Sequence, residues 1–489
     1  MMPSDYSGPW NGPETPKRSM AWRLWNYLRN IVLMPGRVKE LHEITIETQG
    51  LMLRELRRQR DLTKLALART AELHVPDSWT GGQVRVVLLV HYPEAWASLE
   101  GVYWALEEDD RFAVTVASVP RRFPGADRFA GEDLTHDALT ANGVPHIRLN
   151  FSDSFESLDV VRALRPHLVF RQSQWDADVP PAFSSKALGF TRLCLVPYET
   201  MNLVENVRDE ATPTDTAVDA PFHRAAWRVF CANETVRDAA AASNGPLGAE
   251  RFIVTGHPKA ASIGAAAPRW PVAQDGGRRG RIVWSAHHSI GRHWTRFGMF
   301  PRMQHEMLDF ARSRPDLEFV FMPHPMLPSF VGHADSPIGR GEFGAFLAAW
   351  AGLANATTYV GSDYAGVIRA ADAVITDGIS MLIEPQIAMK PIVFVERDDH
   401  RPFNATGRAV VRGVHVHRDV DSAIEAVGRL ALGGADPLVE MQRENVRELF
   451  AHPDPERRII DAIIAGLEAE AGGSPTLLAP VTPIDAASA

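Results

Sequence analysis

Short apolar runs recur along most of the chain and alternate with segments whose apolar residues return every three or four positions. The clearest run is VRVVLLV at residues 84–90. Further runs lie at residues 113–119, 147–149, 168–170, 193–196, 228–231, 252–254, 281–284, 318–322, 374–376 and 391–395. Such runs, separated by helical periodicity, are typical of buried parallel strands joined by helices. The pattern therefore predicts an α/β fold with two doubly wound, Rossmann-like domains.

Breaks in this alternation mark the expected domain boundaries. A stretch rich in Ala, Pro and Gly at residues 260–280 separates the two sets of strands. The expected order is a disordered or interfacial tail, an N-terminal helix, a first domain, a second domain, C-terminal helices and a flexible tail. These segments are placed at residues 1–36, 37–75, 83–258, 281–435, 436–470 and 471–489.

The stretch AADAVITDGISMLIEPQIAMKPIVFV at residues 370–395 predicts a βαβ unit, with a buried helix at residues 381–389. Ligands of open α/β sheets bind at the carboxyl ends of the strands, so the turn after the first strand is a candidate site. The candidate residues are Thr376, Asp377, Gly378 and Ser380. A helix start with a glycine and a serine hydroxyl suits an anion, most commonly phosphate. The alternative is an ordinary Asp or Ser helix cap without a ligand.

His324 is a second candidate for the same edge of the sheet. It follows the apolar run at residues 318–322 and stands between Pro323 and Pro325. The two prolines fix the loop, so the imidazole is expected on a stiff turn at a strand's carboxyl end. A donor phosphate between this loop and the turn at residues 376–380 would accept a hydrogen bond from His324.

In these segments the chain resembles the CDP-glycerol glycerophosphotransferase family, the teichoic-acid polymerase-like enzymes of GT-B architecture. The resemblance rests on PHP at residues 323–325, AADAVITDGIS at 370–380, KPIVFV at 390–395, VTGHPK at 254–259 and PFHRAAWRVFCANE at 221–234. It implies two domains facing a cleft, with the nucleotide donor on the second. It also implies that the C-terminal helices cross back toward the first domain.

The resemblance leaves the catalytic base open. Family members have a His-Gly pair after the strand that here is residues 193–196, but this chain has Pro197-Tyr198-Glu199. Glu199 is one candidate, because a carboxylate at a strand end can accept a hydroxyl proton. His91, at the end of the first strand, is the competing candidate, and His223 is a third. The missing histidine also keeps open a catalytically inactive binding or scaffold protein.

Three further residues are predicted to bind the donor. Glu384 follows Ser380 by four residues and could accept from a ribose hydroxyl, although it could equally be a helix carboxylate without a ligand. The family starts a loop near the donor where this chain has His287 and His288. These histidines lack an acidic partner at ligand spacing, so a metal site is not expected.

Composition and charge narrow the partners and the cell compartment. The chain has 489 residues, 45% of them hydrophobic, and a formal charge of −9. Residues 17–69 carry 12 Lys and Arg against 5 Asp and Glu, a net +7, which leaves −16 for the rest. The acidic charge of the remaining chain argues against nucleic acid as a partner. The basic, tryptophan-bearing N-terminal segment suits binding to an anionic membrane surface; the alternative is a helix that packs its tryptophan face on the two domains. Two cysteines without metal or redox spacing indicate reduced thiols in the cytoplasm, with peripheral attachment to the inner face of the membrane as a further expectation.

The sequence thus predicts a transferase that uses a nucleotide-activated donor such as CDP-glycerol or a nucleotide sugar. The transferred group is a polyol phosphate or a sugar, and the acceptor is a polymer or lipid-linked precursor of the cell surface. No cofactor is expected, because helix termini and histidines can stabilise the phosphate charge. The alternatives are a UDP-sugar glycosyltransferase or sugar epimerase of GT-B fold, and the inactive binding protein.

Overall fold

The computed structural model describes residues 19–21, 24–25, 42, 44–59 and 79–472, apart from residues 124–127, 207–213, 273–278, 292 and 362. The chain divides into two compact units, Met1–Leu67 and Ala68–Ala489. In the first unit, residues 44–59 are helical. The large apolar side chains of this helix are exposed: Ile44, Ile46, Leu51, Met52, Leu53 and Leu56. The rest of the expected N-terminal helix, both tails and most of the tryptophan-bearing segment lie outside the described residues.

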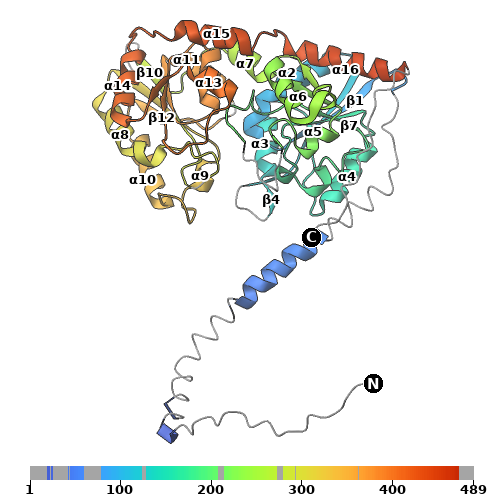
Figure 1. Cartoon of the computed structure of the whole chain (residues 1–489), viewed down its shortest axis with the longest axis horizontal. Helices are drawn as coiled ribbons and strands as arrows, with labels where there is room; N and C mark the ends of the chain where they lie inside the picture. Colours follow the sequence, from blue (N-terminus) through green and yellow to red (C-terminus); the bar gives the residue numbers. More distant parts are fainter. Residues whose placement is uncertain are drawn as a thin grey trace, which may run out of the picture. The chain divides into compact units, whose positions relative to one another are not determined.

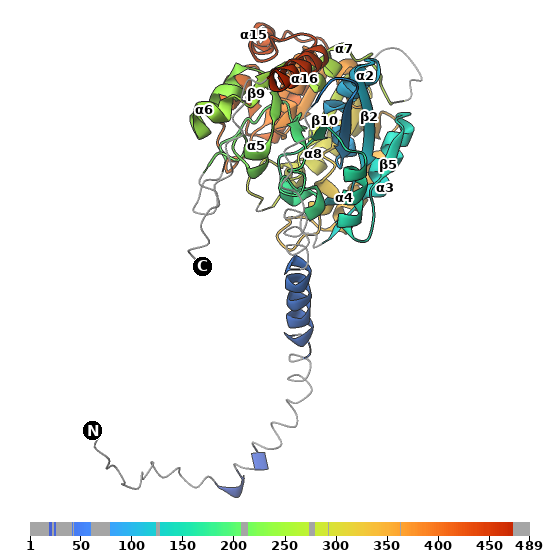
Figure 2. The same cartoon turned by 90° about the vertical axis from the view of Figure 1, so that its right-hand side faces the viewer.

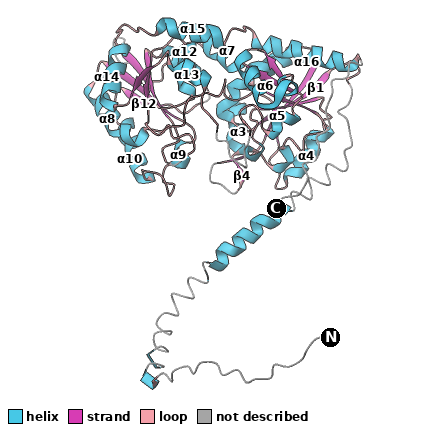
Figure 3. Cartoon of the chain, in the orientation of Figure 1, coloured by secondary structure: helices cyan, strands magenta, loops and turns pink. Residues whose placement is uncertain are grey.

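The second unit contains two parallel sheets, shown in magenta in Figure 3. The first has the strand order β5-β2-β1-β6-β7-β8-β9. Its strands are β1 (Val84–Val90), β2 (Phe112–Ser118), β5 (His146–Arg148), β6 (Leu168–Arg171), β7 (Arg192–Leu195), β8 (Arg228–Cys231) and β9 (Phe252–Val254). A short antiparallel pair, β3 (Arg121–Arg122) and β4 (Phe129–Ala130), lies outside this sheet.

The second sheet has the strand order β12-β11-β10-β13-β14-β15. Its strands are β10 (Gly280–Ala286), β11 (Leu317–Pro323), β12 (Ala356–Thr358), β13 (Ala373–Thr376), β14 (Ile392–Val395) and β15 (His415–His417). In both sheets the first strand lies in the interior, and later strands are added first on one side of it and then on the other. This is the doubly wound arrangement predicted from the sequence.

Helices connect the strands of each sheet (Figure 1). In the first domain these are η1 (Pro93–Ser98), α2 (Glu100–Glu107), α3 (Glu132–Ala141), α4 (Ser154–Ala163), η2 (Asp176–Asp178), η3 (Pro181–Phe183), α5 (Pro221–Ala225) and α6 (Glu234–Ala249). α7 (Pro258–Ala265) leads into the second domain, which has α8 (Phe300–Ser313), α9 (Leu327–Phe330), α10 (Arg340–Ala351), α11 (Ala365–Ala370), η4 (Ser380–Leu382), α12 (Glu384–Ile387), α13 (Ala405–Val411) and α14 (Val420–Ala431). Side chains cap several of them; Asp419 at the start of α14 accepts a 2.8 Å hydrogen bond from the N–H of Ser422.

Alternation along the strands explains why helices cover both faces of the second sheet. On β10, Trp284 belongs to an apolar cluster that includes residues of α8, α10 and α14. Its neighbour Val283 points to the opposite face and packs with Ile263 of α7 and Val367 of α11. Because both faces are buried, each strand reads as an apolar run in the sequence. None of the described helices is long and apolar enough to cross a membrane.

The prediction of a helix at residues 381–389 is wrong in its length. The crossover from β13 to β14 contains only η4 and the four-residue α12. Pro385 has no N–H to continue a helical ladder, and Met389 ends the segment with a φ of 54°. The βαβ unit itself is confirmed by the parallel pairing of β13 with β14. The turn at residues 376–380 therefore does not open onto the N-terminus of a regular helix.

The C-terminal helices α15 (Val439–Leu449) and α16 (Pro455–Ala471) belong to different domains. α15 contacts α12 and α13, whereas α16 contacts α2 and contributes Ile459, Ile463 and Leu467 to the first-domain core (Figure 2). The chain therefore crosses back to the first domain, as the sequence predicted.

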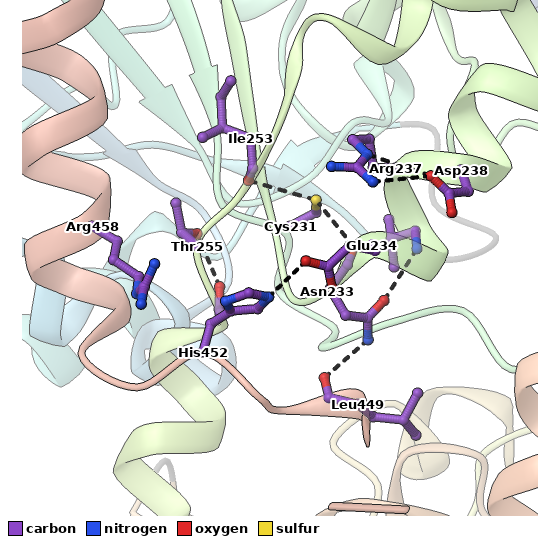
Figure 4. A network of polar contacts seen from close by, with 12 residues as sticks. Cys231, Asn233, Glu234, Arg237, Asp238, Ile253, Thr255, Leu449, His452 and Arg458 are labelled. Carbon is purple, nitrogen blue, oxygen red and sulfur yellow. Dashed lines mark hydrogen bonds and ion pairs between the residues drawn. The ribbon is translucent and has the colours of Figure 1, made fainter. Parts of the chain in front are cut away.

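Polar contacts fix the crossing point between α15 and α16 (Figure 4). The Asn233 amide donates to the carbonyl of Leu449 at 2.9 Å, and His452 lies 3.0 Å from the Glu234 carboxylate. Gly256, in the other connection between the domains, has a φ of 84°, and a Cβ there would lie 2.4 Å from the His452 carbonyl oxygen. The two connections thus pack against each other at a position that requires glycine.

A short first-domain segment, residues 201–206, enters the second domain. Leu203 and Val204 are buried with Phe394 and other second-domain residues in one apolar cluster. Val204 also forms a β-bridge with Phe403, and the Asn404 amide donates to the carbonyl of Asn202 at 2.9 Å. The two domains therefore share a core as well as two connections.

Candidate functional site

Four histidines gather at the carboxyl edge of the second sheet. β10 and β11 end in register at Ala286 and Pro323, which places the loops that carry His287 and His324 side by side. The ring centroids of His287 and His324 are 5.4 Å apart, and those of His288 and His324 are 4.3 Å apart. His293 extends the group, with its ring 5.0 Å from that of His288. We call these four residues the histidine cluster.

Backbone hydrogen bonds favour one tautomer in three of these rings. The Nδ1 atoms of His287, His293 and His324 each accept from the N–H two residues later, at 3.3, 3.3 and 3.1 Å. In a neutral imidazole whose Nδ1 accepts, the proton is on Nε2. The hydrogen-bond pattern thus assigns three Nε2–H donors to the histidine cluster.

Burial lowers the pKa of every ring in the histidine cluster. The pKa of His324 is lowered to about 4, mainly by burial and in smaller part by the charges of Lys259 and Arg121. Burial and the neighbouring histidines also hold the pKa values of His287 and His288 well below the usual value. Neutral imidazole N–H groups can donate hydrogen bonds to an anion. Among the described residues, no group of histidine, cysteine, aspartate and glutamate side chains is arranged to hold a metal ion.

Asp377 holds the loop that carries three of the histidines. Its side chain is fully buried, and its carboxylate accepts from the N–H of His287 at 2.6 Å and from the N–H of Met299. Burial raises the pKa of Asp377 to about 7, although the backbone hydrogen bonds counteract this effect. Both carboxylate oxygens therefore accept from the backbone of the histidine loop, and the contact of Asp377 with a donor stays a prediction.

The turn after β13 lies beside the histidine cluster, as the sequence predicted. A Cβ on Gly378 would lie 3.5 Å from Cδ2 of His287, so the turn and the ring are neighbours. The Thr376 hydroxyl accepts from the N–H of Gly378 at 2.9 Å and thereby fixes the turn. Ser380 is exposed at the start of η4. A ligand on the histidine cluster would lie beside Gly378.

Glu384 has two protein partners. Its carboxylate lies 2.6 Å from Nζ of Lys259 and accepts from the Tyr364 hydroxyl at 2.8 Å. The side chains of Lys259 and Glu384 are largely buried, and Lys259 belongs to α7 between the domains. Burial alone would lower the pKa of Lys259, but Glu384 and Tyr364 outweigh it and raise that pKa. The predicted contact of Glu384 with a ribose hydroxyl therefore competes with an ion pair inside the protein.

The two principal candidate bases differ in accessibility. Glu199 is partly exposed after β7, and burial raises the pKa of its carboxyl while the Lys259 charge lowers it. His91 has no exposed surface, and its N–H is bonded to the Gln172 side chain. Burial and the charges of Arg171 and Arg121 hold the pKa of His91 well below its usual value. Glu199 is thus the more exposed of these two candidates.

His223, the third candidate base, is buried on α5. Its Nδ1 accepts from the N–H of Ala220 at 3.0 Å, and burial lowers the pKa of the ring to about 3. The His223 ring therefore caps the N-terminus of its own helix.

A cavity of about 500 Å³ adjoins the histidine loop. It is lined by Ile290, Gly291, Arg296, Asp335, Pro337, Arg397 and Asp399. Arg397 pairs with Asp399 at 2.5 Å and donates to the carbonyl of Ser289 at 3.3 Å. The charge of Asp335, which lines the cavity, raises the pKa of His293 against the effect of burial. The cavity therefore lies close to the histidine cluster.

Comparison with known proteins identifies the fold. No protein-family model and no curated protein matches the sequence. The structure is similar to UDP-GlcNAc 2-epimerase of Neisseria meningitidis bound to UDP-GlcNAc, with a TM-score of 0.53 and 13% identity over 78% of this chain and all of the other. It is also similar to the UDP-GlcNAc 2-epimerase of Methanocaldococcus jannaschii, with a TM-score of 0.51 and 11% identity over 78% of this chain and 99% of the other. For the wall teichoic acid polymerase TagF the TM-score is 0.53 and the identity 10%, over 86% of this chain and 97% of the other.

The fold is GT-B-like. The sequence predicted this class. Sequence identities of 10–13% show a shared fold and do not show a shared function.

Sequence reasoning missed two residues that join the domains of this GT-B-like fold. Lys259 is the last residue of the VTGHPK motif and had no predicted role of its own. Nothing in the sequence connects it with Glu384, 125 positions later. Tyr364 follows a short strand that the apolar pattern does not reveal, and its ring lies 5.6 Å from Nζ of Lys259. A lysine in the first turn of the helix at the domain connection was the signal available for Lys259.

Proposed function

We propose that the protein is a transferase that moves a polyol phosphate such as glycerol phosphate, or a sugar, from a nucleotide diphosphate donor to a cell-surface polymer or glycan precursor. The observation that carries the proposal is the histidine cluster, in which the Nδ1 atoms of three rings accept from the backbone and, among the described residues, their Nε2–H groups are left to donate. A diphosphate is a ligand that several neighbouring N–H donors suit. The wall teichoic acid polymerase among the similar structures supports the polyol phosphate form of the reaction.

In the proposed reaction the donor phosphates lie on the histidine cluster beside Gly378. The acceptor hydroxyl oxygen attacks the phosphorus of the transferred polyol phosphate, or the anomeric carbon of a transferred sugar. The bond to the nucleotide phosphate oxygen breaks, and Glu199 takes the hydroxyl proton. The leaving nucleotide keeps the bonding electrons as additional negative charge, which the imidazole N–H donors stabilise.

A second candidate function is a sugar epimerase or glycosyltransferase that uses a UDP-sugar. The likeness to UDP-GlcNAc 2-epimerases favours it. The diphosphate would occupy the same histidine cluster, and only the base, the transferred group and the acceptor differ.

A thermal-shift screen of CDP-glycerol, CDP-ribitol, UDP-sugars and GDP-sugars tests both candidates. A ligand at about 100 times its dissociation constant adds roughly 2.7 kcal/mol of stability, so a true donor should raise the melting temperature by several degrees. We expect a cytidine diphosphate polyol to give the largest shift. A shift only with UDP-sugars would favour the second candidate, and no shift with any of them would contradict both.

His324→Ala should weaken binding of that donor by about 10- to 150-fold. Hydrogen bonds to charged groups contribute roughly 1.5–3 kcal/mol, and the Nε2–H of His324 is assigned to the donor phosphate. Isothermal titration with the donor from the screen measures the effect, and His305→Ala, on the exposed side of α8, is the matched control. A His324→Ala protein that melts at a lower temperature but keeps wild-type donor affinity would show that the ring only supports its loop.

The N-terminal segment is proposed to dock on anionic lipid. Residues 20–70 are basic, and the apolar side chains of the described helix at 44–59 are exposed. Deleting residues 20–70 should release the protein from liposomes that contain phosphatidylserine at physiological salt, as measured by co-sedimentation. Liposomes of phosphatidylcholine alone are the control for charge. Equal binding of the intact and shortened proteins to the anionic liposomes would rule out this role.

A further inference from the structure

Lys259 is a buried cation at the place where the two domains meet. It lies in the first turn of α7, and its side chain is only 10% exposed. Its Nζ atom lies 2.6 Å from the Glu384 carboxylate and 5.6 Å from the centroid of the Tyr364 ring, both in the second domain. The charge of Lys259 also acts on His324 of the histidine cluster. The ammonium group is therefore held by the domain to which we assign the donor.

Both oxygens of the Glu384 carboxylate are engaged. Oε1 faces Lys259, Oε2 accepts from the Tyr364 hydroxyl at 2.8 Å, and the side chain is only 2% exposed. A donor hydroxyl that binds Glu384, as the sequence predicted for the ribose, must therefore compete with Lys259 or Tyr364.

The start of α7 is bonded to the segment that carries the candidate base Glu199. The Nε2 atom of His257 lies 2.9 Å from the carbonyl oxygen of Pro197. Because a carbonyl only accepts, Nε2 carries the proton, and Nδ1 accepts from the N–H of Lys259 at 3.2 Å. One imidazole ring thus connects the backbone of Lys259 with the segment at residues 197–199.

The charge of Lys259 reaches Glu199 from this position. Burial raises the pKa of the Glu199 carboxyl, and the Lys259 charge lowers it. Burial and the charges of Glu199 and Asp178 raise the pKa of Tyr198, so this neighbour is neutral. The pKa of His257 is lowered to about 4, mainly by burial. Among the groups that the structure describes around Glu199, Lys259 is thus the cation that offsets the effect of burial.

Two carboxylates from different domains therefore compete for one ammonium group. Glu384 holds the ion pair, whereas Glu199 is influenced by the same charge without a direct contact. An opposite charge that comes closer to a carboxyl group favours its ionised form more strongly. A donor hydroxyl that displaces Lys259 from Glu384 would leave the ammonium group to Glu199.

We propose that Lys259 is a positioning residue that keeps the base Glu199 ionised, and that donor binding at Glu384 turns the ammonium group toward Glu199. The inference rests on the proposed transferase function and on the predicted contact of Glu384 with the donor. It specifies the order of the reaction, because the base obtains its cationic partner only when the donor is bound. Lys259 itself keeps its proton throughout and acts through its charge.

The pH dependence of the wild-type enzyme tests the coupling. The profile of kcat/KM for the donor reports the ionisation of the free enzyme, and the profile of kcat reports that of the complex. We expect the acid limb of kcat to lie about 0.5–1 pH unit below that of kcat/KM, because Glu199 is closer to the charge in the complex. Coincident limbs, or a limb of kcat at the higher pH, would overturn the effect of donor binding.

Two substitutions should move the acid limb of kcat/KM in opposite directions. Lys259→Met removes the cation and should raise the limb by about 0.5–1 pH unit. Glu384→Gln removes the competing carboxylate and should lower the limb, although it also weakens donor binding. Lys259→Arg keeps the charge and should leave the limb closer to wild type than Lys259→Met does. Lys186→Met, at an exposed lysine of the first domain, is the control and should not move the limb.

The opposite shifts separate an electrostatic role from a structural one. Lys259→Met and Glu384→Gln break the same buried pair, so both should lower the melting temperature. A pair with only a structural role would leave the limb in place or move it in the same direction in both variants. If Lys259→Met is too unstable for kinetics, Lys259→Met combined with Glu384→Leu also lacks the cation and should titrate above wild type. An unmoved limb in a folded variant without the cation would contradict the proposal.

Failure of the proposed function would look different. If no nucleotide raises the melting temperature in the screen, the transferase function fails. The effect of Lys259 on Glu199 is then measured by carbon-13 NMR titration of the Glu199 carboxyl, which is assigned by its absence in Glu199→Gln. A titration that moves to higher pH in the variants without the cation would support the role of Lys259 independently of the reaction. If nucleotides bind and these variants titrate like wild type, the role of Lys259 fails and the transferase function stands.

Discussion

Glu199→Gln is expected to reduce turnover by about 10²- to 10⁴-fold while donor affinity changes little. The substitution preserves the shape of the side chain and removes the carboxylate that accepts the hydroxyl proton. Burial raises the pKa of Glu199 above its usual value, and the Lys259 charge opposes this effect in part. The base must be ionised to act, so the wild-type rate should fall on the acid side of the profile through a pKa above 4.5.

The measurement is a single-turnover rate with the donor identified by thermal shift, recorded across pH for both proteins. The acid limb should disappear in Glu199→Gln. Glu205→Gln is the matched control, because Glu205 is exposed in the same segment. Unchanged turnover in Glu199→Gln would eliminate this residue as the base, and His91→Asn would then be the decisive variant.

Lys259→Met should destabilise the protein by about 3–5 kcal/mol. Lys259 and Glu384 form a buried ion pair at 2.6 Å, and removal of one partner leaves the other charge buried without compensation. Methionine keeps much of the apolar stem, so the loss reports the charge and the hydrogen bond more than the packing. Chemical denaturation followed by circular dichroism measures the free energy of unfolding.

A second substitution shows whether the lost stability comes from the stranded carboxylate. Lys259→Met combined with Glu384→Leu replaces the pair by apolar groups and should recover most of the stability. Lys186→Met, at an exposed lysine of the first domain, is the control for the substitution itself and should stay within about 0.5 kcal/mol of wild type. A Lys259→Met protein as stable as the control would mean that Glu384 finds water or another partner.

Much of the fold could be predicted because local pattern determines it. Strands buried on both faces, such as β10 and β11, must be apolar throughout, and they are the runs that the sequence displays. The edge strand β12 has only partly buried and exposed positions and leaves no such signal. The helix at residues 381–389 was predicted from apolar spacing alone, but Pro385 limits the hydrogen bonds that the backbone can make.

The part of the candidate site that could be predicted consists of residues at the ends of neighbouring strands. His324, His287 and Gly378 each follow a strand of one parallel sheet, and strand ends in such a sheet meet at one edge. The pairing of Lys259 with Glu384 depends on how two domains pack, which no local pattern encodes. The favoured histidine tautomers likewise depend on backbone geometry two residues further along each loop.

Residues 201–206 set a condition for exchanging domains between proteins of this architecture. This segment comes from the first domain by sequence, but Leu203 and Val204 complete the apolar cluster around Phe394. A chimera that joins a foreign first domain to residues 281–435 would leave a hole in the second domain where this segment belongs. Replacing the foreign segment with residues 201–206 of this chain should restore expression of the chimera, because the inserted side chains belong to the recipient core.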